Sequence, residues 1–227
     1  MTERYELRTI ARLYGDLPGK FGLPRQAGIV EELEGRIVFE PAFRNPDALR
    51  GLEGFSHLWL IWQFSEAVRE DWSPTVRPPR LGGNTRMGVF ATRSPFRPNA
   101  LGLSCVRLLG IETDPALGPV LRVGGADLMD GTPIYDIKPY LPYADAWPEA
   151  RAGFAPDPGT ALPVVFAPGE EEKLPAEKRA ALRGVLAQDP RPRYQKDPDR
   201  VYGLAFAGRN VKFRVADGCV YVTEVET

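Results

Sequence analysis

The feature that most limits how this chain can fold is a series of short strand-like runs separated by turn residues. Apolar and polar residues alternate over residues 7–13, and β-branched and aromatic residues dominate 55–64, 120–123 and 219–225. Glycine and proline, 23 of each, lie between such runs and interrupt long helices. Short strands with a turn every roughly eight to twelve residues are typical of a β-barrel or β-sandwich. We therefore predict a mainly β fold with short helices.

A central strand and a short helix are the clearest local predictions in the N-terminal part. Residues 55–64 are mostly aromatic or β-preferring and follow Gly54, which indicates a largely buried strand. Asn45 followed by Pro46 is typical of a helix N-terminus, so residues 45–51 are expected to form a short helix. The other strands expected here cover residues 7–13, 29–34 and 36–39 (a hairpin turning at Gly35), 87–92, 101–110 (whose first turn could also be helical), 120–123 and 133–137 (after a turn at Asp130-Gly131).

Composition changes near residue 145. Residues 146–168 are rich in Ala, Pro, Asp and Gly with weak periodicity, which is typical of a linker. Beyond them, residues 175–187 carry an apolar stripe at helical spacing, and Asp217-Gly218 is a hairpin signal between strand-like runs. We therefore predict a β-barrel domain over residues 1–145, a linker over 146–168 and a small α+β domain over 169–227. The stripe is Ala181, Leu182, Val185 and Leu186, and the C-terminal strands are expected over 201–206, 211–215 and 219–225.

The composition is that of an ordinary globular chain with a reduced interior. None of the 227 residues belongs to an apolar run of the ~20 residues that a membrane span needs. Charged residues rather than an apolar signal segment follow Met1, so we expect a cytoplasmic protein with no membrane partner. Cys105 and Cys219 lie far apart in apolar settings and are expected to be free thiols. Because His57 is the single histidine, no metal site is expected.

Basic charge is concentrated in residues 72–111. This stretch contains six arginines and no Asp or Glu, and the whole chain has a formal charge of −1, so the remainder carries −7. The stretch is also rich in Pro, Gly and Asn, which fix loop backbone, while arginine suits phosphate and carboxylate. It predicts a pre-shaped loop surface for an anionic partner, or alternatively a solvated, turn-rich rim. The six are Arg77, Arg80, Arg86, Arg93, Arg97 and Arg107.

Other chemistries find little support in the sequence. Gly82-Gly83 has neither the spacing of a phosphate-binding loop nor that of a dinucleotide fingerprint. No segment resembles the nucleophile elbow of hydrolases, so a Ser/His/Asp mechanism would depend on His57 alone. Taken singly, His57 could equally be a hydrogen-bonded core residue, and the polar run 127–138 could be turn caps and surface charge.

Six segments are individually weak signals, but together and in this order along the chain they form a specific pattern. They are residues 24–26 (Pro-Arg-Gln), 51–59, 77–84, 88–94, 96–99 (Phe-Arg-Pro-Asn) and 127–140. Together they resemble the TsaA-like, or TrmO, family of tRNA methyltransferases, and residues 186–194 resemble the C-terminal domain of its bacterial members. The family motif commonly reads Arg-Pro-Asn-Pro-Ile/Leu-Gly. Here Ala100 replaces the second Pro while Arg97, Asn99 and Gly102 are retained, which affects local rigidity only.

The resemblance implies a fold and an activity. The fold would be a compact TsaA-like β-barrel, unlike the Rossmann-type methyltransferases. The protein would bind S-adenosylmethionine and act in tRNA modification as a homodimer with active sites near the subunit interface. It would methylate N6 of threonylcarbamoyladenosine at position 37, next to the anticodon. Two alternatives remain open: an RNA-binding module without catalysis, and a methyltransferase of the same fold acting on another amine.

The resemblance also implies which residues hold the cofactor. Arg25, Arg86 and Arg93 are expected to bind its carboxylate or substrate phosphates, and Asp127 and Asp130 its ammonium or ribose. The full set implied for cofactor binding is Pro24, Arg25, Gln26, His57, Leu58, Arg86, Arg93, Leu101, Asp127, Leu128, Met129, Asp130 and Gly131.

The substrate side follows from the same resemblance and from the chemistry of the reaction. The target N6 is poorly basic because its lone pair is delocalised, so Asp136 or Tyr140 is expected to act as a base, and both stay open. Arg97 or Lys138 is expected to bind the threonyl carboxylate, and further arginines the phosphates of the anticodon loop. The full set implied for substrate binding is Arg77, Arg80, Arg97, Asn99, Lys138, Arg191, Arg193 and Tyr194.

Overall fold

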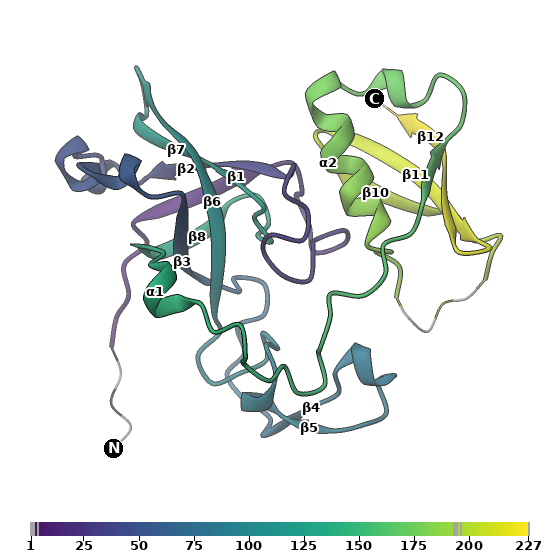
Figure 1. The fold of residues 1–227 in the computed structure, drawn as a ribbon, viewed down its shortest axis with the longest axis horizontal. Helices are drawn as coiled ribbons and strands as arrows, with labels where there is room; N and C mark the ends of the chain where they lie inside the picture. The colour runs from purple at the N-terminus through teal and green to yellow at the C-terminus, as the bar shows by residue number, and fades with distance from the viewer. Residues whose placement is uncertain (1–2, 4, 193–194, 196, 227) are drawn as a thin grey trace.

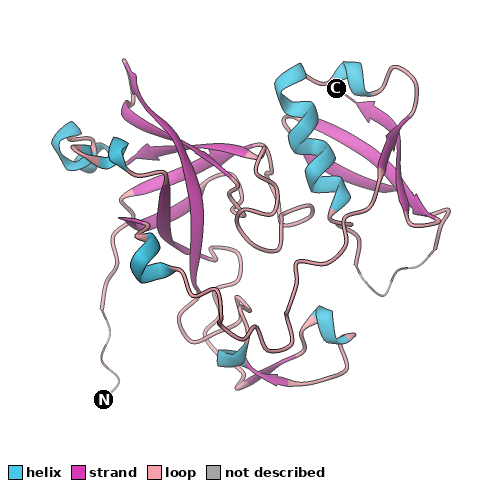
Figure 2. Ribbon diagram, viewed as in Figure 1, coloured by secondary structure: helices cyan, strands magenta, loops and turns pink. Residues whose placement is uncertain are grey.

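The structure, a computed structural model, describes residues 3, 5–192, 195 and 197–226. Figure 1 shows a β-barrel on the left, a smaller C-terminal domain on the right and a β4–β5 hairpin below them. Figure 2 shows that strands and loops dominate and that helices are few and mostly short. The predicted mainly β architecture with a barrel is therefore confirmed. No helix in the described ranges is long and apolar enough to cross a membrane.

Six strands close the barrel, and every neighbouring pair is antiparallel. Closure leaves none of these strands as an edge, so their backbone hydrogen bonds are satisfied within the sheet. In spatial order the strands are β1 (Ala11–Gly15), β2 (Glu34–Phe39), β7 (Gly118–Gly124), β6 (Leu101–Asp114), β3 (His57–Gln63) and β8 (Thr132–Pro139), which pairs back with β1.

The aromatic run predicted to be a central strand is β3, which pairs with β6 on one side and β8 on the other. Its side chains alternate strictly between buried and partly exposed. Leu58, Leu60 and Trp62 fill the barrel core, whereas Trp59 and Gln63 face outward. This alternation is what a barrel wall requires, since successive residues of a strand point to opposite faces.

Several predicted strands differ from the observed ones. The first begins at Ala11 rather than at residue 7. The hairpin predicted at Gly35 is wrong: Gly35 lies inside β2, where it pairs with both Gly15 and Val123. Residues 87–92 form only the two-residue strand β5 followed by a 3₁₀ turn. In each case pairing with a distant strand, rather than local pattern, sets the limits of the element.

Short helices lie between the strands. Asn45 caps the 3₁₀ helix Pro46–Leu49 by accepting a hydrogen bond from the backbone N–H of Asp47, as the sequence predicts. The only α-helix that the structure describes in the N-terminal domain is α1 (Pro142–Asp145). The other 3₁₀ helices are Pro41–Phe43, Leu52–Gly54, Pro79–Leu81, Val89–Ala91 and Glu171–Lys173.

Residues 65–100, here called the arm, leave the barrel after β3 and return to it at β6. A backbone hydrogen bond of 2.9 Å from Phe64 N to Ala100 O joins the two ends of the arm. Within it, β4 (Thr75–Val76) pairs with β5 (Met87–Gly88) to form the small hairpin at the bottom of Figure 1. The arm therefore contains most of the arginine-rich stretch and stands outside the closed sheet.

The C-terminal domain is a four-stranded sheet covered by one helix (Figure 1). Helix α2 (Ala176–Ala187) buries the apolar stripe predicted for it. Asp217 and Gly218 have φ of 49° and 71°, the left-handed values that a tight hairpin turn needs. The strands are β10 (Tyr202–Phe206), β11 (Arg209–Ala216), β12 (Cys219–Glu226) and β9 (Val164–Phe166), in that spatial order.

Strand β9 falls within the stretch predicted to be a linker. It pairs in parallel with β12, with Val164 opposite Val220. Just before it, Leu162 N donates a 2.8 Å hydrogen bond to Ala187 O at the end of α2. Residues from 162 onward thus belong to the C-terminal sheet, and the last part of the predicted 146–168 linker is wrong.

The loop of residues 16–33, between β1 and β2, packs against the C-terminal domain and shares its core. Leu17, Val30 and Leu33 are buried in the same cluster as the α2 stripe. Phe21 stacks on Phe213 with ring centroids 6.3 Å apart. Asp16 forms a 2.7 Å ion pair with Lys178 of α2, on side chains that are largely buried. The two domains are therefore joined by a hydrophobic core as well as by the connecting chain.

Gly102 of β6 is required by the barrel core. A Cβ at this position would overlap the indole ring of Trp62 directly. We expect Gly102→Ala to lower the free energy of unfolding by about 1–3 kcal/mol, because the ring must leave its packed position. The matched control is Gly110→Ala in the same strand, where no atom lies within 4 Å of the added Cβ. Urea denaturation monitored by tryptophan fluorescence measures both, and equal stability of the two variants would contradict this packing.

Candidate functional site

A pocket of about 420 Å³ lies where the barrel, the 16–33 loop and the base of the arm meet. All three contribute walls, so the site exists only when distant parts of the chain are folded together. The lining residues are Lys20, Leu23, Pro24, Arg25 and Gln26 from the loop; Trp59, Trp62, Gln63, Leu101, Gly102, Leu103, Asp127, Met129 and Thr132 from the barrel; and Phe64, Ser65, Glu66, Ala67, Arg93, Pro95, Phe96 and Arg97 from the arm and its junction.

A chain of hydrogen bonds lies beneath the pocket. The indole Nε1 of Trp62 donates to Ser104 Oγ at 2.9 Å, and Ser104 Oγ donates to Asp127 Oδ1 at 2.5 Å. Because the serine hydroxyl accepts one bond and donates the other, its proton points toward the carboxylate. Asp127 therefore presents a fixed anion to the pocket, positioned by two barrel strands.

Burial raises the pKa of the Asp127 carboxyl above its ordinary value, because an apolar environment disfavours the charged form. Hydrogen bonds from Ser104 and from the backbone N–H groups of Ala27 and Asp127 act in the opposite direction, as does the charge of Arg93. The net direction is upward, so this carboxylate gains a proton at a higher pH than an exposed aspartate does. A cation placed beside it would favour the charged form.

Positive charge approaches the pocket from the loop and the arm. The guanidinium of Arg93 donates to the side-chain oxygen of Gln26, which joins the arm to the 16–33 loop. Arg97 donates to the backbone carbonyl of Thr92 at 3.3 Å, which fixes its side chain at the pocket wall. Arg25 lines the same space. The pocket thus combines one partly buried carboxylate with three arginines.

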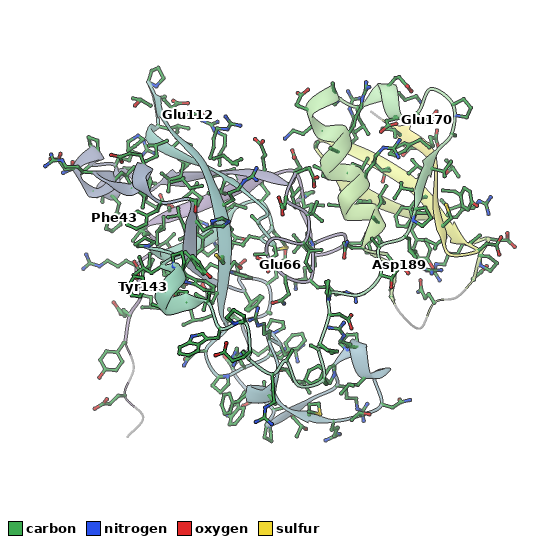
Figure 3. All side chains as sticks on the ribbon, viewed as in Figure 1. Phe43, Glu66, Glu112, Tyr143, Glu170 and Asp189 are labelled. Carbon is green, nitrogen blue, oxygen red and sulfur yellow. The ribbon has the colours of Figure 1, made fainter. Side chains whose placement is uncertain are left out.

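An ion pair joins two of the lining residues. Lys20 of the 16–33 loop lies 3.3 Å from the carboxylate of Glu66 at the base of the arm, and its Nζ also donates to the Glu66 backbone carbonyl at 3.1 Å. Both side chains are more than half exposed, so their attraction is screened by solvent and is weak. Figure 3 labels Glu66 on the side of the barrel that faces the C-terminal domain.

Aromatic and aliphatic side chains form the rest of the wall. The ring of Phe96 is covered on one face by the guanidinium of Arg69, 4.0 Å from its centroid. Leu101 and Leu103 point outward from β6 and are exposed, 57% in the case of Leu103. Trp59 contacts Tyr140, with ring centroids 5.9 Å apart. The pocket therefore offers both apolar surface and charge.

Seven of the residues predicted to bind the cofactor line the pocket, and six do not. Leu58 and Leu128 are buried in the barrel core. The carboxylate of Asp130 accepts the backbone N–H of Gly15 at 3.0 Å, so it stabilises the turn before β8. His57 lies at the far end of β3, where its Nδ1 is 2.9 Å from Ser56 Oγ. The lining residues are Pro24, Arg25, Gln26, Arg93, Leu101, Asp127 and Met129; those outside are His57, Leu58, Arg86, Leu128, Asp130 and Gly131.

Among the residues predicted to bind substrate, Arg97 lines the pocket. Arg80 instead binds Asp157 of the connecting chain at 2.9 Å, and Arg191 binds Asp189 at 2.8 Å inside the C-terminal domain. The structure therefore gives both of these arginines structural partners. Arg77, Asn99 and Lys138 lie outside the lining, and Arg193 and Tyr194 lie outside the described residues.

The two predicted bases lie on the outer face of the barrel beside the pocket. Asp136 forms a 2.8 Å ion pair with Lys138 and accepts the backbone N–H of Ile137 at 2.9 Å. Tyr140 donates its backbone N–H to His57 O at 2.9 Å, and its ring contacts the lining residue Trp59. Neither side chain lines the pocket itself.

Sequence reasoning missed several residues that line the pocket or support it. Trp59 and Gln63 belong to the run predicted as a buried strand, and neither was given a role in the site, although Trp59 also ends the segment 51–59. Successive residues of a strand point to opposite faces, so both lie on the outer face of the barrel. Ser104 carried no signal in the sequence, because its role depends on Trp62 and Asp127 being brought together by the barrel. The Lys20–Glu66 pair likewise joins residues far apart in the chain.

Comparison with known proteins places this architecture in one family. Residues 14–146 match the model of the tRNA-methyltransferase O N-terminal domain, and residues 160–227 match that of the TrmO C-terminal domain. The chain is similar to the tRNA (adenine(37)-N6)-methyltransferase of Escherichia coli, with 45% identity, covering 91% of this chain and 92% of the relative. The enzyme of the same name from Eikenella corrodens is 50% identical, over 75% of this chain and 97% of that one.

Solved structures agree with this assignment. The crystal structure of TrmO from Pseudomonas aeruginosa superimposes with a TM-score of 0.83 at 31% identity, covering 99% of both chains. Both family models are found in the expected order, and the family expected from the six sequence segments is confirmed. The chain belongs to the tRNA-methyltransferase O (TrmO) family.

Proposed function

We propose that this protein is an S-adenosylmethionine-dependent methyltransferase that modifies N6 of threonylcarbamoyladenosine at position 37 of tRNA. The observation that carries the proposal is the pocket that brings Asp127 together with Arg25, Arg93 and Arg97. Relatives at 45% and 50% identity carry the name tRNA (adenine(37)-N6)-methyltransferase, which supports the same reaction here.

The pocket fits S-adenosylmethionine in size and in chemistry. Its volume of about 420 Å³ lies in the range of small-molecule sites. The cofactor combines an ammonium group, a carboxylate and a positive sulfur with a polar ribose and an aromatic adenine ring. A partly buried carboxylate, nearby arginines and exposed leucines complement the ammonium group, the carboxylate and the adenine ring, respectively. When bound, this cofactor supplies an electrophilic methyl group.

Individual residues then take definite roles. Asp127, fixed by Ser104, would hold the ammonium group of the cofactor. Arg93, positioned by Gln26, would bind its carboxylate. Leu101 and Met129 would cover apolar parts of the ligand and exclude water. Holding both reactants in a fixed orientation supplies a large part of a methyl-transfer rate, up to ~7–11 kcal/mol in favourable cases.

The substrate would approach along the outer face of the barrel. Arg97 would bind the threonyl carboxylate, with Lys138 as its alternative. The target N6 is poorly basic, so a residue that accepts its proton would assist. Tyr140 is the stronger candidate because its ring contacts Trp59 in the pocket wall, whereas the carboxylate of Asp136 is already paired with Lys138.

We further propose that the protein acts in the cytoplasm as a homodimer. Leu101 and Leu103 are exposed on β6 directly beside the pocket, which supports a subunit contact close to the site. A contact there would shield the apolar rim of the pocket from water. Light scattering of the purified protein measures its mass in solution.

Asp127 should determine cofactor affinity. We expect Asp127→Asn to weaken binding of S-adenosylmethionine by about 10- to 100-fold, because a charge-assisted hydrogen bond is worth roughly 1.5–3 kcal/mol. In the unsubstituted protein, affinity should fall as the pH drops through the raised pKa of Asp127, since protonation removes the anion. The variant should lack this dependence. Calorimetric titration across acidic pH measures both effects.

The matched control for this titration is Asp130→Asn, three residues away and outside the pocket. Its amide oxygen can still accept the Gly15 N–H, so the turn is preserved and cofactor affinity should not change. If Asp127→Asn and the unsubstituted protein bound S-adenosylmethionine with equal affinity, Asp127 would not contact the cofactor. A loss in Asp130→Asn instead would place the cofactor elsewhere.

The reaction itself is tested on tRNA. Purified protein incubated with S-adenosylmethionine should add one methyl group to tRNA that contains threonylcarbamoyladenosine and none to the same tRNA with unmodified adenosine. Mass spectrometry of the nucleosides identifies the product. In a strain lacking the protein, the methylated nucleoside should disappear, and its persistence would overturn the assignment of the substrate.

A further inference from the structure

Two aromatic side chains on the arm are exposed to solvent and pack against each other. Trp72 and Phe90 have exposed fractions of 50% and 72%, and their ring centroids lie 6.0 Å apart. Trp72 precedes β4 and Phe90 follows β5, and Val89 N donates to Pro74 O at 2.9 Å beside them. The hairpin thus holds the two rings together at its open end.

Packing in the hydrophobic cores does not account for the position of the Trp72–Phe90 pair. Both rings lie outside the barrel core and outside the C-terminal core. The buried neighbour that anchors this part of the arm is Val89, at 1% exposure, whereas Phe90 next to it points away. Leaving two large aromatic side chains in water forfeits the stabilisation that their burial would give. Adjacent exposed aromatics of this kind are typical of a ligand-binding surface.

The charged residues near the aromatic pair indicate which kind of ligand the pair would bind. Between Trp72 and Phe90 the charged residues are Arg77, Arg80 and Arg86, with no acidic residue, although Glu70 and Asp71 directly precede Trp72. Arg77 follows β4 and Arg86 precedes β5, so both lie on the same hairpin as the aromatic pair. Among the described residues, neither arginine has an acidic partner within 4.0 Å, unlike Arg80, which is bound to Asp157. Single-stranded nucleic acid binds to such a surface, because its bases stack on aromatic rings and its phosphates pair with arginines.

The position of the pair connects it with the pocket. Phe90 is three residues before Arg93, so their Cα atoms are at most about 11 Å apart, at ~3.3–3.6 Å per residue. Arg93 and Phe96 line the pocket, as do Ser65 and Glu66 at the other end of the arm. Along the arm the order is therefore pocket, aromatic pair and arginine-bearing hairpin. An RNA strand entering the pocket would meet the aromatic pair next.

We propose that Trp72 and Phe90 form a stacking platform for a nucleotide that neighbours the target adenosine in the anticodon loop. Arg77 and Arg86 contact the phosphates of the same strand. This inference rests on the proposed function and identifies how the tRNA strand is held outside the pocket. Stacking on aromatic rings suits unpaired bases of any sequence, so the platform supports affinity and orientation rather than base identity.

The test uses a synthetic anticodon stem-loop containing threonylcarbamoyladenosine as the probe. We expect Trp72→Leu combined with Phe90→Leu to bind it about 5- to 150-fold more weakly, the range that loss of one stacked base gives. Leucine keeps apolar character but removes the ring face. Trp72→Phe and Phe90→Trp should retain binding, because they keep an aromatic surface. Affinity for S-adenosylmethionine should be unchanged in every variant.

Salt dependence separates stacking from charge. Arg77→Ala should lower the slope of log affinity against log salt by about 1, the value for one lost phosphate contact. The leucine variant should lower affinity at every salt concentration without changing that slope. Tyr143→Ala is the matched control, because Tyr143 is 85% exposed on α1, outside the arm (Figure 3), and its loss should leave RNA affinity unchanged.

Two results would overturn the platform. The first is RNA binding by the leucine variant equal to that of the unsubstituted protein. The second is a change in its oligomeric state by light scattering without loss of RNA affinity, which would assign the pair to a contact between two copies of the chain. Failure of the proposed function looks different: the unsubstituted protein would bind the stem-loop through the platform but transfer no methyl group to it.

Discussion

Closure of the six-stranded sheet is the constraint on which the rest of the structure depends. Because β8 pairs with β1 as well as with β3, the barrel interior is sealed and its size is fixed. Trp62 fits this interior only because Gly102 opposite it has no side chain. The same packing directs the indole N–H to Ser104 and, through Ser104, fixes Asp127 at the pocket. The packing of Trp62 in the core thereby determines where the Asp127 carboxylate lies.

The pocket walls depend on a second core. The 16–33 loop carries Pro24, Arg25 and Gln26 to the pocket, and this loop is held by the C-terminal domain through Leu17, Val30 and the stacked Phe21. On its other side, Gly28 N donates to Gly125 O of the barrel at 2.8 Å. The loop is thus fixed at both sides although it has no regular secondary structure. None of the described residues of the small domain lines the pocket, yet this domain determines the shape of one wall by holding the loop.

Sequence reasoning succeeded where the physical cause is local. The cap at Asn45, the tight turn at Asp217-Gly218 and the apolar stripe of α2 depend on neighbouring residues, and all three were predicted. It failed where strands from distant segments decide the outcome, as at Gly35 and at β9. The same contrast between local and long-range causes applies to the candidate site. Contiguous segments identified some loop and arm residues, such as Arg25 and Arg93, but only the closed barrel shows that Asp127 faces the pocket while Asp130 stabilises a turn.

The core that the two domains share has a consequence for replacing one domain without the other. Val30 of the loop packs so closely on α2 that a Cβ on Gly184 would lie 2.6 Å from it. The barrel segment and the C-terminal segment therefore meet through matched shapes, and each limits the substitutions that the other can accept. A crossover in the connecting chain that joined a barrel to a foreign C-terminal domain would preserve both folds and still misplace the loop between them. In this chain, therefore, the loop is placed correctly only when the barrel is joined to the C-terminal domain whose surface matches it.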